Sequence, residues 1–333
     1  MTVLEAIPAT VAPERRRLMG SAYDLSGATD ADSARALAGL EWEVTHRPLY
    51  VDLPDDQGLA LVEKERGVVR SDNAELFGVV GREHKVLSNA ELFGFADTLL
   101  TEADTTWAAS SPFGGSLAGG KQPFLAFQLG EGVQVAGQDA VKCAVLMSNG
   151  HVGNTAFTVT VTPIRTRCSN VVRAAIRTGK KGQALFSHTV QHSGDLAAKV
   201  EEARAALSLT SVYMREFGDL ADRMAAIDFD QSMFSDFLTE LVPISDEAGD
   251  RAKVTAENQR AAFRANWRDT LTLSPDLRGT AWGALNIITE VIDHGNLDAR
   301  KSKVAPAERR MNSVHFGSGA RLRDRAFHLL AGV

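Results

Sequence analysis

The spacing of apolar residues changes past the middle of the chain, and this change constrains the fold more than any other feature. Before residue 190, apolar residues occur in short runs that alternate with polar ones and are separated by Gly-rich links, which predicts strands. From Asp195 they recur every three or four residues, which predicts long amphipathic helices. The sequence therefore predicts an α+β fold, with an antiparallel β-meander packed on helices and a mostly α-helical C-terminal half.

The same pattern predicts three regions: an N-terminal arm over 1–28, an α+β core over 29–190 and a helical region over 191–333. A helix is expected at 88–100, where Ser88 and Glu91 form a capping box. Further helices are expected at 31–39, 169–179, 231–241, 246–267 and 280–294, with one of about 30 residues from Asp195. Strands are expected at 42–51, 59–69, 76–80, 107–109, 123–129, 133–135, 141–148 and 155–166.

The overall composition is that of a globular protein. The chain has 333 residues, of which 44% are hydrophobic and 23% are charged. No run of 18 apolar residues predicts a membrane span, and the apolar run at the N-terminus precedes its basic cluster, which is the reverse of a secretory signal. We therefore expect a cytoplasmic protein with no membrane partner.

A stretch without carboxylates marks the centre of the chain. Residues 140–194 contain no Asp or Glu but seven Lys or Arg, in a chain of net charge −6, so that the remainder carries −13. Buried strands are poor in carboxylates anyway, but this does not explain six basic residues between 165 and 181. A segment of this kind is typical of a surface that neutralises phosphates. The candidate DNA-binding residues are Lys142, Arg165, Arg167, Arg173, Arg177, Lys180 and Lys181.

Two of these residues lie at the end of the strand expected at 155–166. The apolar residues of this strand change parity after Pro163, and we expect a bulge near Thr162 and Pro163 that turns Arg165 and Arg167 outward together. A second basic stretch at 300–325 is interpreted as a solvated helix face or tail.

Two patterns come close to catalytic motifs, and each departs from its motif. The GxxxxGK pattern at 115–121 is followed by Gln122 instead of Ser or Thr and then by an expected strand, which favours a hairpin loop over a phosphate-binding loop. Asp55, Asp56 and Glu63 resemble the carboxylates of a metal-dependent nuclease, but the residue between the acid and the lysine of that motif is missing.

Histidine and cysteine also give no site. His188 and His192 are one helical turn apart but have no acid or cysteine nearby to complete a zinc site. Cys143 and Cys168 are too few for a disulfide framework and are interpreted as structural thiols. We therefore expect no enzyme activity, no cofactor and no metal.

Five segments resemble the phage/plasmid-like protein family, a family catalogued as a domain of unknown function. They include FGVVG-xxx-KVLSNAELF at 77–93 and TVTPIRTRCSN at 160–170, and the resemblance covers about 30–330. Where the family commonly has Tyr after Thr-Glu, this chain has Val291. The resemblance implies an origin in a mobile element, and with it a location in a bacterial host cell, and no activity by itself. The other three segments are 39–50, 279–290 and 316–326.

A second resemblance concerns the order of elements. The segment HKVLSNAELFGF at 84–95, followed by antiparallel strands and a basic helix, is similar to the core of Rad-type single-strand annealing proteins, over about 100 residues. In those proteins a ring of subunits holds extended single-stranded DNA in a basic groove. The resemblance implies a recombination protein that anneals complementary strands without nucleotide hydrolysis, as a ring or filament of identical copies. It also allows a phage exonuclease as a further partner.

Two other functions remain open at this stage. The first is an accessory protein of a mobile element that binds a host protein through its C-terminal helices, its basic segment being ordinary surface. The second is a metal-dependent nuclease that uses Asp55, Asp56 and Glu63.

Overall fold

The structure is a computed structural model that describes residues 17–19, 22–54, 57–130, 132–152, 156–165, 187–190, 210–269, 273–294, 306–315 and 317–332. It contains one large and one small antiparallel sheet, with strands in the N-terminal half and mostly helices in the C-terminal half. The predicted α+β class is confirmed.

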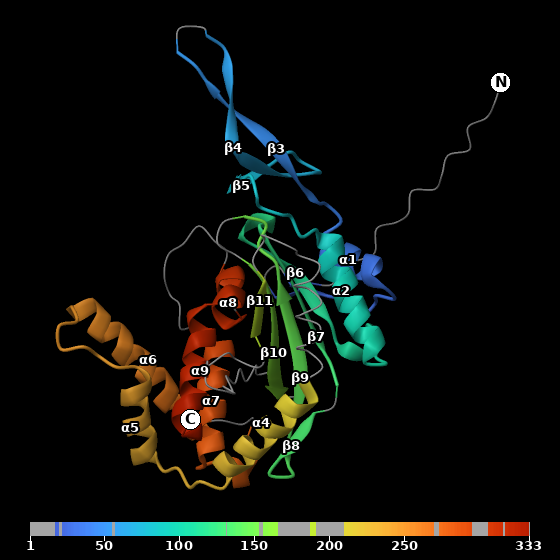
Figure 1. The fold of residues 1–333 in the computed structure, drawn as a ribbon. Helices are drawn as coiled ribbons and strands as arrows, with labels where there is room; N and C mark the ends of the chain where they lie inside the picture. The colour runs from blue at the N-terminus through green and yellow to red at the C-terminus, as the bar shows by residue number, and fades with distance from the viewer. Residues whose placement is uncertain are drawn as a thin grey trace.

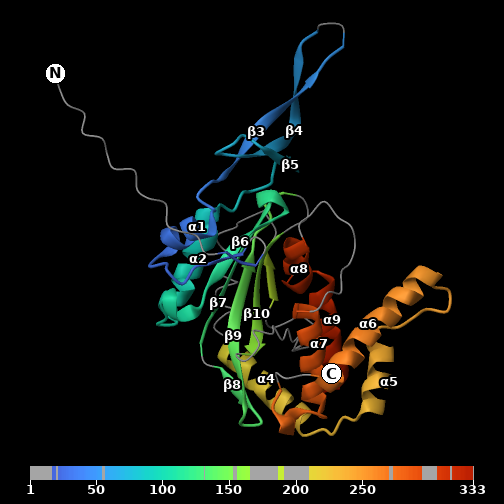
Figure 2. The same cartoon turned by 180° about the vertical axis from the view of Figure 1, so that it is seen from behind.

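The large sheet has eight strands in the order β1-β2-β6-β7-β9-β10-β11, with β8 paired to β9. In both views α1 and α2 lie at one side of this sheet and α7 to α9 at the other (Figures 1 and 2). The strands are β1 (Arg17–Met19), β2 (Ala22–Asp24), β6 (Phe113–Leu117), β7 (Gln122–Gln128), β8 (Val133–Val135), β9 (Asp139–Ser148), β10 (Phe157–Arg165) and β11 (Ser187–Val190).

The small sheet consists of β3 (Val44–Asp52), β4 (Leu59–Arg70) and β5 (Leu76–Gly81), in that order, and we call it the β-arm. It projects from the rest of the molecule (Figure 1). The register between β3 and β4 shifts after Pro48. The Arg66 guanidinium stabilises the backbone at this shift by donating hydrogen bonds to the carbonyls of Val62, Glu63 and Glu65.

The base of the β-arm is attached through aromatic and apolar contacts. Val44, Val68, Phe77 and Val80 are buried in the main core. The Arg70 guanidinium carbon lies 4.3 Å from the centroid of the Trp42 ring, which itself makes an edge contact with Phe77.

The helices are α1 (Ala31–Ala38), α2 (Asn89–Glu102), α4 (Thr210–Ala225), α5 (Gln231–Leu241), α6 (Asp250–Asp269), α7 (Ala281–His294), α8 (Pro306–His315) and α9 (Ser318–Ala331). The capping box of α2 is present, because the Ser88 hydroxyl accepts from the Glu91 amide at 3.1 Å and the Glu91 carboxylate accepts from the Ser88 amide at 2.7 Å. Asp30 caps α1 in the same way.

One large hydrophobic core joins the strand-rich and helical parts. It runs from Leu25 to Leu330 and includes residues of α2, β9, β10, α4, α7 and α9. The buried Trp282 of α7 donates its indole N–H to Asp139 of β9 at 2.9 Å, and this bond spans 143 residues of sequence. The change of period near residue 190 therefore does not separate two cores.

Three sequence-based expectations are corrected. Residues 17–19 and 22–24, which the sequence places in a loose arm over 1–28, form β1 and β2 of the large sheet, where β2 pairs with β6. The strand expected at 107–109 is replaced by a 3-10 turn at Ala108–Ser110. The Gly-rich link expected at 114–120 contains β6, whose two glycines give no alternation to detect; a Cβ on Gly114 would lie 3.0 Å from the Phe124 carbonyl oxygen.

The bulge expected near Thr162 and Pro163 is also absent from the described pairing. The register between β9 and β10 runs without a shift from the Thr158 pair to the Arg165 pair. Pro163 fits this regular strand because β11 pairs only with 157–160 of β10. At position 163 the strand therefore has β9 as its one described neighbour, and no amide hydrogen bond to a second strand is required there.

Candidate functional site

The structure describes two of the seven candidate DNA-binding residues. Lys142 lies on β9 with an exposed side chain, which makes no hydrogen bond or ion pair with the described residues. The backbone of Arg165 forms the last position of β10. The other five, Arg167, Arg173, Arg177, Lys180 and Lys181, lie outside the described residues, as does the helix expected at 169–179.

The register of β9 and β10 separates positions 142 and 165. Lys142 is opposite Ile164, whereas Arg165 is opposite Val141. Because directly opposed residues in an antiparallel pair share a face and neighbours along a strand alternate, positions 142 and 165 fall on different faces of the sheet. The expectation of one continuous surface that includes both residues is therefore not supported within the sheet.

The two faces differ in chemistry. On one face Val141, Cys143, Val145 and Met147 belong to the main hydrophobic core. The other face carries Lys142 and, on β10, a row of threonines at 158, 160 and 162. Thr160 and Thr162 are only 6% and 4% exposed, so on this face the central positions are covered and Lys142 is accessible.

The GxxxxGK segment is a hairpin connection, as the sequence predicts. It runs from the end of β6 through a short 3-10 turn, Ala118–Gly120, into β7. The Ala118 amide, one of the groups that would face a phosphate, donates to the Glu308 carboxylate of α8 at 2.6 Å. A carboxylate in this position opposes an anion, which agrees with the interpretation as a structural loop.

The alternative nuclease site is described only in part. Glu63 is exposed on β4, while Asp55 and Asp56 lie outside the described residues. Within the described part of the chain, no group of three or more His, Cys, Asp or Glu side chains is arranged to hold a metal ion. Likewise His188 is described only as backbone of β11, and His192 lies outside the described residues.

A pair of histidines that the sequence did not single out lies at the base of the β-arm. The His46 Nε2 and His84 Nδ1 atoms are 3.2 Å apart. Burial, and secondarily the nearby Arg66 guanidinium, lower the pKa of His46 below its ordinary value of 6.5, so the neutral ring is favoured. The pair links β3 to the segment after β5, and the neutral ring of His46 suits a structural contact.

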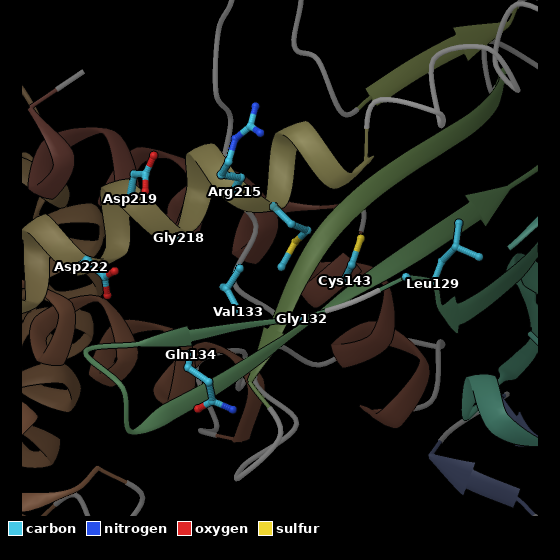
Figure 3. Close-up of a pocket in the computed structure, with 11 residues that line it drawn as sticks. Leu129, Gly132, Val133, Gln134, Cys143, Arg215, Gly218, Asp219 and Asp222 are labelled. Carbon is cyan, nitrogen blue, oxygen red and sulfur yellow. The ribbon is translucent and has the colours of Figure 1, made fainter.

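A pocket of about 480 Å³ lies between α4 and the β8–β9 hairpin (Figure 3). Its apolar lining comes from Leu129, Val133, Cys143 and Met214. α4 lies close to this hairpin at Gly218, where a Cβ would make an ordinary contact of 3.4 Å with the Val133 side chain. The size is within the range of sites for small molecules.

The polar lining of this pocket does not form a catalytic group. Asp219, Asp222, Arg215 and Gln134 surround it, and Asp222 accepts a hydrogen bond of 2.7 Å from the Ala136 amide. Burial raises the pKa of the Cys143 thiol to about 12, so the sulfur stays protonated and is a poor nucleophile. Two carboxylates also make the pocket unsuitable for phosphate. In the sequence the only sign of this pocket is Gly218, a glycine within an expected amphipathic helix.

Taken together, the architecture defines an α+β protein built on a large antiparallel sheet with a projecting β-arm. The model of the family described as "Domain of unknown function (DUF932)" matches residues 76–315, more than two thirds of the chain, and the chain belongs to this family. No curated protein and no solved structure matches it. Among the described residues, no helix has the length and apolar character needed to cross a membrane.

Proposed function

We propose that this protein binds single-stranded DNA and anneals complementary strands without a chemical step. The observation that carries the proposal is the segment 140–194, which has seven basic residues and no carboxylate in a chain that is otherwise acidic. Arg and Lys neutralise phosphates and leave the bases free to pair, so annealing requires a cationic surface and no catalytic group.

The sheet register separates two of the candidate DNA-binding residues. Positions 142 and 165 fall on different faces, so one face of the sheet cannot hold both. We assign the main contacts to Arg165 and the five basic residues that follow it because these six cluster within 17 residues of sequence, and Lys142 stays a weaker candidate. This assignment keeps the DNA at the end of β10.

The wider setting of the proposal rests on the two resemblances. The five segments shared with the phage/plasmid-like proteins support an origin in a mobile element. The order of α2, the antiparallel strands and the following basic segment supports a likeness to Rad-type annealing proteins. This likeness extends the proposal to a ring or filament of identical copies and allows a phage exonuclease as partner.

The salt dependence of binding to a fluorescent oligonucleotide tests the proposal. Six phosphate contacts to a single strand predict that log K falls with log salt with a slope of about −4. Arg165→Glu with Arg167→Glu removes two contacts, so we expect much weaker binding and a slope shallower by about 1.4. Binding that is insensitive to salt, or unchanged in this variant, contradicts the proposal.

A matched control reverses two exposed arginines elsewhere. Arg82→Glu with Arg251→Glu changes the net charge by the same amount, on the segment after β5 and on α6, and we expect a much smaller loss of affinity. Equal losses in both variants indicate a general charge effect instead of a defined surface. Pairing of two complementary oligonucleotides, followed by fluorescence quenching, then tests annealing itself.

One observation favours the alternative of a partner-binding protein. Three apolar residues in this region are exposed: Ile227 between α4 and α5 (44%), Met233 on α5 (43%) and Val254 on α6 (59%). Exposed apolar residues on C-terminal helices are suited to a protein contact. This alternative is supported if the protein does not bind DNA and if Met233→Lys loses contact with a host protein. The nuclease alternative is supported if the protein cleaves DNA only in the presence of Mg²⁺.

A further inference from the structure

The β-arm carries most of the strongly exposed large apolar side chains of the described chain. Nine such residues are exposed, and six of them lie on β3, β4 and β5. Soluble monomers rarely expose a contiguous apolar patch of more than about 300–600 Å², and larger ones mark interaction surfaces. The six are Tyr50, Val51, Leu59, Leu61, Leu76 and Val79.

The register divides these residues between two faces. Val79 is opposite Gly67, and Leu76 is opposite Val69, so both lie on one face. Leu49 lies on this face too, because a Cβ on Gly67 would be 3.1 Å from the Leu49 side chain and 3.0 Å from that of Leu76. The absence of a side chain at Gly67 lets these two leucines come together across the central strand.

We call this the outer face of the β-arm. It also includes Val51, which has the parity of Leu49, and the partly buried Val62, which is opposite Leu49. The inner face is covered at its base, where Val68 and Val80 are buried in the main core. At the tip, the side opposite the outer face carries Tyr50 and its pair Leu61.

Two unpaired charges accompany the outer face. Arg47 is opposite Gly67, and Glu65, opposite Gly81, has the parity of Gly67, so both positions share this face. Both side chains are exposed, and neither makes a hydrogen bond or ion pair with the described residues. An apolar surface with one free charge of each sign is complementary to its own copy when the two are related by a twofold axis.

We propose that the outer face of the β-arm packs against the same face of a second copy of this chain. In this isologous contact Leu76 and Val79 near the base and Val51 toward the tip form the apolar part, and between them Arg47 of each copy pairs with Glu65 of the other. The contact is a packing of one sheet on another, which brings the two arms about 10 Å apart.

The dimensions suit a stable contact. β3 has nine residues, about 30 Å at 3.3 Å per residue, and two to three strands are about 10–14 Å wide, so the face covers roughly 300–420 Å² in projection. Protruding side chains make the accessible surface larger than its projection and bring it toward the ~800 Å² per partner of a standard interface. An isologous contact closes at two copies, so it does not by itself build the ring or filament of the proposed function, and the inference does not depend on that function.

Sedimentation equilibrium of the full chain without DNA tests the contact. We expect wild type to associate in pairs, and Leu76→Lys to raise the dissociation constant about thirtyfold or more, because a charge replaces an apolar group within the contact. Leu61→Lys is the matched control, since Leu61 and Leu76 are each 51% exposed but lie on different faces. A wild type that stays monomeric at every soluble concentration, or equal effects of the two variants, overturns the proposal.

An exchange of charges distinguishes a second copy from another partner. Arg47→Glu and Glu65→Arg each place like charges together, and each variant alone is expected to dissociate about tenfold more readily. Mixed in equal amounts, the two variants bring opposite charges together at both positions and regain the wild-type association. A mixture that remains as dissociated as its components overturns the isologous arrangement.

Two further measurements keep the outcomes separate. The far-UV circular dichroism melt of each variant verifies that it folds, and the substituted side chains are exposed in the single copy. Binding of an oligonucleotide to Leu76→Lys tests the proposed function independently, since each copy retains its basic segment. Dimers that do not bind DNA contradict the proposed function alone, and DNA-binding monomers contradict the β-arm contact alone.

Discussion

At the scale of single residues, the helical part contains a buried ion pair that links three helices. The Arg323 guanidinium of α9 donates to the Asp293 carboxylate of α7 at 2.6 Å and also to the Val314 carbonyl of α8. Arg323 is 1% exposed and Asp293 is 6% exposed. Neither charge can be left alone in this environment, because an isolated buried charge is strongly destabilising.

We therefore expect Asp293→Ala to lower the free energy of unfolding by about 3–5 kcal/mol, the cost of leaving one member of a buried pair without its partner. Arg325→Ala, two residues from Arg323 on the exposed side of α9, removes one hydrogen bond to the Glu240 carbonyl and is expected to cost no more than about 1 kcal/mol. Urea unfolding of both variants measures the difference. Similar costs for the two would show that the buried pair is not important for stability.

At the scale of elements, the positions of helices and strands are the features that local sequence describes best. The bounds of α5 at 231–241 and of β8 at 133–135 agree with the prediction residue for residue, and those of α2 and β4 agree within two residues. Periodicity and caps depend on neighbours a few positions away, so they can be recognised without the rest of the fold.

The cap of α2 gives a prediction at this scale. Ser88→Ala removes the acceptor for the Glu91 amide, and we expect a loss of about 1 kcal/mol in the free energy of unfolding. Ser88→Thr keeps a hydroxyl in place and is expected to stay within about 0.5 kcal/mol of wild type. Thermal or urea unfolding decides this, and a threonine variant as unstable as the alanine variant would contradict the assignment of the cap.

At the scale of the whole molecule, the strand-rich and helical parts depend on each other. The Trp282–Asp139 hydrogen bond, the bond from the Ala136 amide to Asp222 and the shared core all cross the change of period near residue 190. A large shared core makes independent unfolding of either part unfavourable.

We therefore expect one cooperative unfolding transition. The far-UV circular dichroism signal, which reports mainly the helices, and the fluorescence of the tryptophans, which lie in both parts at positions such as 42 and 282, should give the same midpoint. A fragment that ends at residue 190 should not reach a stable fold, because the Asp139 carboxylate and the apolar face of β9 lose their cover. Two separated transitions, or a stably folded fragment, would refute this dependence.

For the candidate DNA-binding surface, the sequence predicts which residues are basic but not which of them share a face. The absence of acids over 140–194 is a property of composition and needs no structure. Whether Lys142 and Arg165 act together depends on the pairing register, and the expected bulge would have changed that register by one residue. A shift of one residue moves every following side chain to the other face, so parity counted from sequence alone is easily wrong.

Local periodicity, capping and composition were enough to establish the α+β class, most helices and strands of the described chain and the position of the cationic segment. Only the complete fold shows which faces of the sheets and helices are covered. The Glu308 carboxylate meets the Ala118 amide across 190 residues, β1 and β2 join the large sheet, and the outer face of the β-arm stays exposed. Each of these depends on partners far apart in the chain, which no local pattern specifies.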